Sequence, residues 1–246
     1  MQHRSKKIKK SFFIILVVLI VLSGSSAIYL GNYYHSVDVE KYMTSSSEVT
    51  IKKFDKGWFF DGAGEEKALI FYPGAKVATE AYAPLMYQLE ESGIDCFLVD
   101  MPFHMAFFGM NRAEEIMQEY NYEAWYLGGH SLGGAMAANF AADYVEDHTD
   151  GIRGLLLLAA YPTKDLSTSD MSVVTVYGSE DGVLNMDKIV AGRELMPQDY
   201  KEVCIEGGNH AQFGSYGAQK GDGTAAIPAE EQWARTVEVF VGDESE

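Results

Sequence analysis

The sequence predicts an α/β fold with a mostly parallel central sheet and helices on both of its faces. Two observations support this prediction. From residue 49 onward, short apolar runs of strand length alternate with segments that have helical spacing, and repeated strand–helix units build parallel sheets. The run 152–160 (IRGLLLLAA) is apolar apart from Arg153, as expected for a strand that is covered on both faces.

The individual elements follow from local pattern. Residues 49–54 and 57–60 have the spacing of a strand pair joined by a tight turn. Leu85, Met86 and Leu89 fall on one helical face, and Ser92-Gly93 is a typical helix end. The predicted strands are 49–54, 57–60, 67–72, 95–99, 124–127, 152–160, 173–177 and 200–205. The predicted helices are 82–91, 111–120, 132–145, 187–195 and 229–241.

Composition and charge narrow the classes of function. The 246 residues are 47% apolar and 22% charged, which is ordinary for a folded domain of moderate size. The net charge is −17, although residues 1–10 hold only basic charges. The rest of the chain is therefore strongly acidic and would repel phosphate backbones, which argues against nucleic-acid binding. We expect a small-molecule substrate and a monomer.

The N-terminus predicts a membrane anchor. A basic cluster at 3–10 precedes an unbroken apolar run over 12–22, and no formal charge occurs between Lys10 and Asp38. A helix over 12–30 would be about 28 Å long, close to the roughly 30 Å hydrocarbon core of a bilayer. Because basic clusters stay cytoplasmic, the domain that follows would lie outside the cytoplasm.

A cleaved signal peptide competes with the anchor. The apolar core is 11 residues long, and Ser25-x-Ala27 resembles a small-residue cleavage site. We favour the anchor because apolar residues resume after Ala27, so that a secreted protein is the alternative. The predicted organisation is an anchor or signal peptide over 1–35, a polar tether over 36–48 and one folded domain over 49–246.

A candidate nucleophile stands at a strand-to-helix turn. Residues 129–133 read Gly-His-Ser-Leu-Gly and separate the predicted strand 124–127 from the helix 132–145. This G-x-S-x-G pattern places a serine on a sharp turn that needs glycines two residues before and after it. The same turn puts Ser131 at the amino end of a helix, where negative charge is favoured. The pattern therefore indicates a nucleophilic serine.

A serine nucleophile needs a base, and the base needs an orienting acid. With this turn the acid and then the base follow the serine along the chain. His210 comes directly after the last predicted strand, whereas His148 lies in a polar loop, so His210 is the predicted base. Asp181 follows the strand 173–177 and is the predicted acid, with Glu180 and Asp187 as alternatives.

The negative charge that develops on a substrate oxygen needs two fixed donors. One is expected to be the backbone N–H of Leu132, the residue after the nucleophile. The other is expected from the loop Tyr72-Pro73-Gly74-Ala75, where the Ala75 N–H is the better candidate.

These residues together resemble the α/β-hydrolase superfamily over about residues 65–241. The motifs are Tyr72-Pro73-Gly74-Ala75, Gly129-His130-Ser131-Leu132-Gly133, Gly178-Ser179-Glu180-Asp181 and Gly208-Asn209-His210. The chain is most similar to small, lidless bacterial members related to the dienelactone-hydrolase-like group, which are often exported and membrane-anchored. The resemblance implies the α/β-hydrolase fold and hydrolysis of an ester or lactone through an acyl-enzyme.

Two departures from the resemblance limit what it implies. Pro73 stands where many members carry a histidine, and the nucleophile is a serine where dienelactone hydrolases use cysteine. The dienelactone substrate is therefore not carried over to this chain.

Other residues bear on substrate and cofactors. Four residues of the loop after strand 95–99 are candidates to line the acyl site, although the phenylalanines could instead pack against the core: Phe103, His104, Phe107 and Phe108. Cys96 and Cys204 lie in apolar runs and are predicted to be buried thiols, with no metal-binding spacing between cysteines and histidines. We expect no metal and no cofactor.

Three classes of function fit this sequence. A serine hydrolase of carboxylic esters is the first. A thioesterase, amidase or cell-envelope acyltransferase on the same scaffold is the second. The third is a binding protein without activity, because a fold does not fix a function, and the complete set of Ser131, Asp181 and His210 argues against it.

Overall fold

The computed structural model describes residues 15–21, 24, 31–62, 64, 66–148 and 151–243. Contacts divide the chain between Tyr33 and Tyr34, and the unit that begins at Tyr34 holds the whole described sheet. Residues 63, 65, 149, 150 and 244–246 of that unit lie outside the described part of the chain.

The sheet has eight strands in the order β1-β2-β4-β3-β5-β6-β7-β8. Their bounds are β1 Thr50–Phe54, β2 Gly57–Asp61, β3 Lys67–Tyr72, β4 Asp95–Val99, β5 Ala124–His130, β6 Ile152–Leu158, β7 Ser172–Gly178 and β8 Tyr200–Ile205. The hairpin of β1 and β2 is antiparallel, and β2 is antiparallel to β4; every other pair is parallel. The carboxyl ends of the six parallel strands therefore share one edge, where α/β sheets carry their sites.

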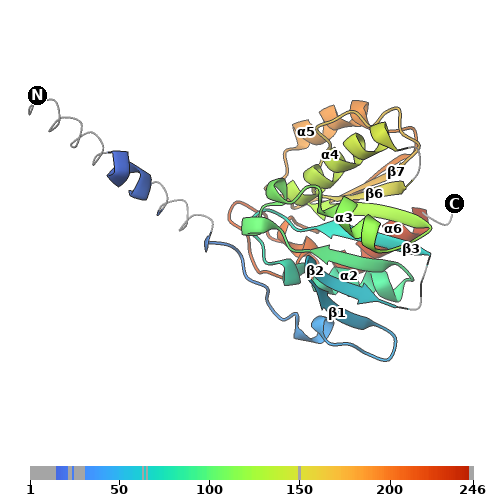
Figure 1. The fold of residues 1–246 in the computed structure, drawn as a ribbon, viewed down its shortest axis with the longest axis horizontal. Helices are drawn as coiled ribbons and strands as arrows, with labels where there is room; N and C mark the ends of the chain where they lie inside the picture. The colour runs from blue at the N-terminus through green and yellow to red at the C-terminus, as the bar shows by residue number, and fades with distance from the viewer. Residues whose placement is uncertain are drawn as a thin grey trace, which may run out of the picture. The chain divides into compact units, whose positions relative to one another are not determined.

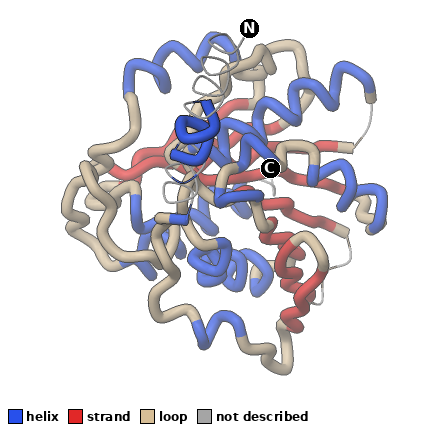
Figure 2. The backbone as a smooth tube through the Cα atoms, turned by 60° about the vertical axis from the view of Figure 1, so that its left-hand side comes forward, coloured by secondary structure: helices blue, strands red, loops and turns tan. Residues whose placement is uncertain are grey.

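Helices cover both faces of the sheet (Figure 1). The α-helices of the domain are α2 Ala83–Glu91, α3 Arg112–Glu119, α4 Leu132–Asp147, α5 Met186–Gly192 and α6 Ala229–Asp243. Five short 3-10 helices matter for the loops: η1 Glu40–Met43, η2 Thr79–Tyr82, η3 Pro102–His104, η4 Ala106–Phe108 and η6 Ala211–Phe213. Figure 2 shows the strands in red with the helices in blue around them.

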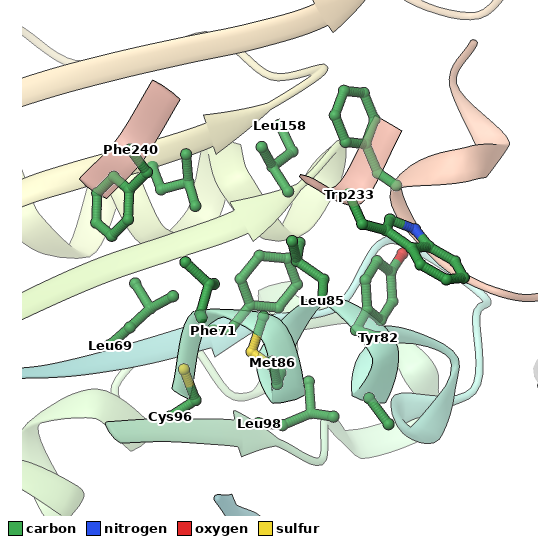
Figure 3. Packing of buried hydrophobic residues seen from close by; sticks show 14 of the residues in the cluster. Leu69, Phe71, Tyr82, Leu85, Met86, Cys96, Leu98, Leu158, Trp233 and Phe240 are labelled. Carbon is green, nitrogen blue, oxygen red and sulfur yellow. The ribbon is translucent and has the colours of Figure 1, made fainter. Parts of the chain in front are cut away.

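Alternation along the strands builds two cores. In β3, Leu69 and Phe71 face a cluster that includes residues of α2 and α6, whereas Ala68 and Ile70 face a cluster that includes residues of α3 and α4. Figure 3 shows the first cluster, with Phe71 beside Leu85 and Met86 of α2. Because apolar residues occupy both faces, the parallel strands are covered on both sides.

The element predictions agree closely with the structure. Three predicted strands match the observed bounds, namely 67–72, 95–99 and 200–205, and three more differ by at most one residue at either end, namely 49–54, 57–60 and 173–177. Strand β5 is three residues longer than predicted, because parallel pairing with β3 continues through Gly129 and pairing with β6 continues through His130. Glycines weaken a strand signal in sequence, although here they are fully paired.

The predicted membrane helix over 12–30 falls largely outside the described residues. Residues 15–21 and 24 of that span are described, and they are helical. Within the described part of the chain, no helix has both the length and the apolar character needed to cross a bilayer.

The stretch 36–48, expected to act as a tether, makes ordered contacts with the domain. Val39 is buried, and Tyr42 packs against Tyr87 and Trp233 with ring centroids 5.9 and 6.0 Å apart. Apolar residues spaced among the serines and threonines account for this packing, since each can bury its side chain while the polar residues stay in water.

The prediction that both cysteines are buried is half right. Cys96 in β4 is buried, whereas Cys204 in β8 is exposed, and both are free thiols. Within the described sheet, strand β8 is an edge strand, paired with β7 along one side and with no strand along the other. An apolar run on an edge strand does not guarantee burial on both faces.

Candidate active site

Ser131 occupies a strained turn between β5 and α4. Its backbone has φ 54° and ψ −121°, a region that costs a residue with a side chain of order 1–3 kcal/mol. The Ser131 N–H donates to the Leu158 carbonyl oxygen at 2.8 Å, which fixes the turn to β6. The turn thus holds the serine at the carboxyl edge of the sheet and at the amino end of α4.

Glycines make this turn possible through close backbone approach. A Cβ atom on Gly129 would lie 2.6 Å from the Gly133 carbonyl carbon, and one on Gly133 would lie 2.1 Å from the Tyr72 oxygen. Neither position has room for a methyl group. The spacing of glycines two residues before and after the serine is therefore a steric requirement, as the sequence pattern predicts.

His210 and Asp181 form a buried hydrogen-bonded pair. Asp181 Oδ2 lies 2.8 Å from His210 Nδ1, and each side chain is 2% exposed. The other carboxylate oxygen of Asp181 accepts the N–H groups of Val183 and Leu184 at 2.9 and 2.8 Å. With Nδ1 bonded to the acid, Nε2 is the ring atom of His210 that remains for other chemistry.

Asp222 and Gln232 hold the loops that carry this pair. Asp222 accepts the N–H groups of His210, at 3.2 Å, and of Gly182, at 3.1 Å, so one carboxylate joins the loops after β8 and β7. Gln232 of α6 is fully buried, accepts the Asn209 N–H and donates back to the Asn209 oxygen. These contacts also anchor the glycine-rich stretch 217–226.

Ser131 and His210 line the same cleft. Its volume is about 350 Å³, and its walls come from the turn between β5 and α4, from the loop after β6 and from the loop after β7. The other lining residues are Leu132, Ala135, Met136, Ala159, Ala160, Tyr161, Thr163, Val183, Leu184 and Asn185. No hydrogen bond joins the Ser131 hydroxyl to the His210 ring in this described region, and such bonds often tighten only when substrate binds.

The predicted oxyanion donors are the backbone N–H groups of Ala75 and Leu132. The N–H groups on either side of Ala75 are already bonded. Gly74 donates its N–H to the Tyr82 hydroxyl at 3.0 Å, and Lys76 donates its N–H to the His104 oxygen at 2.7 Å. The Ala75 N–H between them makes no hydrogen bond within the described chain, and neither does the Leu132 N–H at the start of α4. The structure therefore leaves these two donors available.

A buried pair, Tyr82 and His130, lies beneath the site. The Tyr82 hydroxyl is 2.7 Å from His130 Nδ1, and the His130 and His210 rings are 4.4 Å apart. Since the hydroxyl accepts the Gly74 N–H, its own hydrogen is assigned to His130 Nδ1. Burial, and then the nearby His210, hold the pKa of His130 well below its usual value, so the ring is neutral.

The phenylalanine loop lies apart from this cleft. Phe103, Phe107 and Phe108 are 58%, 67% and 56% exposed, and their rings contact one another. Phe107 and Phe108 line a separate hollow of about 330 Å³. Burial lowers the pKa of the His104 side chain. The backbone oxygen of His104 accepts the Lys76 N–H, next to the predicted donor Ala75; the loop 72–76 is called the oxyanion loop below. A role of Phe103, His104, Phe107 and Phe108 in substrate binding stays a prediction.

Sequence reasoning predicted the candidate catalytic residues and missed the residues that hold them in place. Asp181 and His210 are hydrogen-bonded, and Ser131 and Leu132 line the same cleft as His210. Tyr82 and Asp222 were not predicted, because their partners are close in space and distant in sequence. The only sequence signal for the Tyr82–His130 pair is the position of His130 inside the nucleophile motif.

Comparison with known proteins identifies the family. A family model described as the alpha/beta hydrolase family matches residues 68–234. The chain therefore belongs to the α/β hydrolase family, as the motifs indicated. No curated protein sequence matches the chain.

Solved structures share the fold at low sequence identity. Est1E from Butyrivibrio proteoclasticus is 16% identical with a TM-score of 0.57, covering 81% of this chain and all of Est1E. Carboxyl esterase 2 from the fungus Tuber melanosporum is 14% identical with a TM-score of 0.60, covering 85% and 89% of the two chains. A thermostable esterase from Pseudomonas putida is 16% identical with a TM-score of 0.56, covering 82% and 87%. At these identities the likeness shows a common fold.

Proposed function

We propose that this protein is a serine hydrolase of carboxylic esters. The observation that carries the proposal is the buried Asp181–His210 pair in the cleft that Ser131 lines. In this assignment Ser131 is the nucleophile, His210 the general base and Asp181 the group that orients the imidazole. The names of the similar structures, two of which are esterases by description, support the same chemistry.

The first half of the reaction transfers the acyl group. His210 Nε2 takes the hydroxyl proton while Ser131 Oγ bonds to the carbonyl carbon, and the carbonyl electron pair moves onto oxygen. The N–H groups of Leu132 and Ala75 stabilise that oxyanion. When the carbon–oxygen single bond of the ester breaks, the leaving alkoxide takes the proton from His210 and departs as an alcohol.

The second half releases the acid. His210 takes a proton from water, whose oxygen attacks the acyl carbon and forms a second oxyanion at the same donors. Collapse breaks the bond to Ser131 Oγ, which recovers its proton from His210. The carboxylic acid leaves and the starting enzyme is restored.

The cleft favours small, uncharged acyl groups. Most of its lining side chains are apolar, and none of the lining residues is an aspartate, glutamate, lysine or arginine. A volume of about 350 Å³ is at the lower end of the usual range for ligand pockets. We expect short-chain esters to be better substrates than long-chain esters, and thioesters or amides are the second candidates.

The N-terminal segment bears on where this chemistry takes place. The basic cluster at 3–10 and the apolar run at 12–22 support a single-pass anchor with the domain outside the cytoplasm, or export after cleavage. Membrane fractionation with protease treatment of intact cells tests this part of the proposal. A protected, cytosolic domain would contradict it.

Labelling with a fluorophosphonate and turnover of nitrophenyl acyl esters test the assignment. The wild type should be labelled and active, and Ser131→Ala should lose both properties. Asp181→Asn should lower kcat by about 10⁴-fold, whereas the neighbouring Glu180→Gln should leave kcat within a few-fold. A wild type that neither reacts with the probe nor turns over esters would refute the proposed function.

A further inference from the structure

Residues 34–37, here called the strap, run along the loop that carries the proposed oxyanion donor. Tyr34 forms an isolated parallel β-bridge with Val77. Its N–H donates to the Lys76 oxygen at 2.7 Å, and its oxygen accepts the Ala78 N–H at 2.8 Å. Two backbone hydrogen bonds thus fix the strap to residues directly beyond Ala75.

The strap also holds the loop that follows His210. The Tyr34 hydroxyl accepts the Lys220 N–H at 3.2 Å, and its ring lies 5.6 Å from that of Tyr216. Val37 donates its N–H to the Ser215 oxygen at 2.8 Å and accepts the Ser215 hydroxyl at 2.6 Å. The same short segment therefore joins two loops that are more than a hundred residues apart in sequence.

Both loops carry groups of the proposed reaction. Lys76 follows Ala75 and has φ 58°, a left-handed conformation that is unfavourable for a lysine. Its N–H is bonded to His104 and its oxygen to Tyr34, so contacts on both sides maintain the conformation. On the other loop, Asp222 lies two residues after Lys220 and accepts the His210 N–H.

We propose that Tyr34 is a positioning residue, which sets the direction of the Ala75 N–H by holding Lys76 and ties the oxyanion loop to the His210 loop. The inference rests on the proposed function. The strap spans the end of the predicted anchor or signal-peptide segment 1–35 and the start of the predicted tether 36–48, so residues expected to lie outside the folded domain take part in assembling the site.

The expected effect is on transition-state binding. If the Ala75 N–H is misdirected, the oxyanion loses part of one donor, and complete loss of a donor costs about 10²–10³ in rate. Tyr34→Ala keeps the backbone bonds to the loop after Ala75 but loses the ring contact with Tyr216 and the hydroxyl contact with Lys220, so the strap no longer braces Lys76 against the His210 loop. The resulting partial misdirection should lower kcat about tenfold with KM little changed. A trifluoromethyl ketone, which adds the serine Oγ at its carbonyl carbon to give a hemiketal oxyanion, should bind about tenfold more weakly.

The test compares Tyr34→Ala with Tyr42→Ala in the full chain. Tyr42 belongs to the same N-terminal region, and its ring packs on Tyr87 of α2 and Trp233 of α6, away from Lys76. Fluorophosphonate titration counts the competent sites in each sample, so that kcat and inhibitor affinity are expressed per active site. Tyr34→Phe keeps the ring on Tyr216 and loses only the hydroxyl that accepts the Lys220 N–H, so its kcat should lie between those of the wild type and Tyr34→Ala.

Three results separate the possibilities. A lower kcat and weaker inhibitor binding per site in Tyr34→Ala, with both retained in Tyr42→Ala, supports the inference. If Tyr34→Ala only lowers the number of titratable sites or the melting temperature, the strap is merely structural and the inference is wrong. If the wild type itself shows neither labelling nor ester turnover, the proposed function fails and the inference fails with it.

Discussion

Hydrogen bonds, more than crowding, fix the side chains around the cleft. The Asp181 carboxylate accepts two backbone N–H groups besides the His210 ring, so its orientation does not depend on the histidine. Tyr82 is likewise held at its hydroxyl by Gly74 and His130. A buried polar group that loses such a partner costs about 1–3 kcal/mol, so these residues contribute to stability as well as to geometry.

Replacement of Tyr82 by phenylalanine should separate these two contributions. Tyr82→Phe removes the acceptor of the Gly74 N–H and the partner of His130 Nδ1, so we expect kcat/KM to fall about tenfold and stability to fall by about 1–3 kcal/mol. Tyr72→Phe is the matched control. Its hydroxyl is also buried and bonded, to Met110 and Ala113 on the other face of the sheet.

Steady-state kinetics and denaturant unfolding of both variants check this expectation. Both should lose stability to a similar extent, and only Tyr82→Phe should lose activity per active site. Equal activity losses in the two variants would show that the hydroxyl of Tyr82 has no specific part in the site.

What the sequence could predict at this scale depends on chain distance. Ser131 is found by its own motif, and Asp181 and His210 by their places after predicted strands. Asp222 contacts His210 through a loop whose path has no local signal, and Tyr82 reaches Gly74 only because η2 folds back over β3. Such contacts depend on tertiary packing, so spacing along the chain does not reveal them.

Among the elements, the turn from β5 to α4 depends most on its glycines. The main chain of Tyr72 and Pro73 passes directly over Gly133, where a Cβ atom would lie 2.1 Å and 2.4 Å from their oxygens. This close packing sets the start of α4 against the oxyanion loop. Periodicity predicts the helix and the strand, but only the motif predicts that they approach so closely.

Gly133→Ala should therefore damage both stability and activity. The methyl group must displace backbone, so we expect a loss of about 2 kcal/mol and at least a hundredfold fall in kcat through the displaced donors. Gly242→Ala is the control, because Gly242 also lies in a helix and its added Cβ would meet nothing within 4 Å. That substitution should be neutral or stabilising by up to about 1 kcal/mol.

Thermal unfolding and ester turnover of the two alanine variants measure these effects. Wild-type activity in Gly133→Ala would contradict the close packing of the turn. A loss of activity in Gly242→Ala equal to that of Gly133→Ala would show that the assay reports general damage to helices.

At the scale of the whole molecule, the excess of acidic residues includes a buried glutamate, Glu90, that lies close to other acidic side chains. Glu90 near the end of α2 is 5% exposed, and its Oε2 has no hydrogen-bond partner among the described residues. Burial, and then the neighbouring Asp95, raise the pKa of Glu90 to about 7. Further acidic side chains, Glu91, Asp61 and Glu48, act in the same direction.

The raised pKa makes the stability of the protein depend on pH. In the unfolded chain the pKa of Glu90 is near 4.5. Below that pH Glu90 is protonated in both the folded and the unfolded state, so its burial does not lower the free energy of unfolding through a charge. As pH rises toward 7, the unfolded state releases its proton first, so the free energy of unfolding falls. Above about pH 7 the folded protein holds a buried, poorly paired carboxylate, and the full cost is present.

Glu90→Gln should remove this dependence, because the amide keeps the shape of the side chain without its charge. We expect the variant to exceed the wild type by on the order of 2 kcal/mol at pH 8, or about 6 °C in melting temperature for a domain of this size, with a much smaller difference at pH 5. Glu91→Gln, at the adjacent exposed position, should change stability by no more than about 0.5 kcal/mol at either pH. Melting curves at the two pH values decide the matter: a gain in Glu90→Gln that does not grow with pH would mean that ionisation of Glu90 is not what weakens the fold.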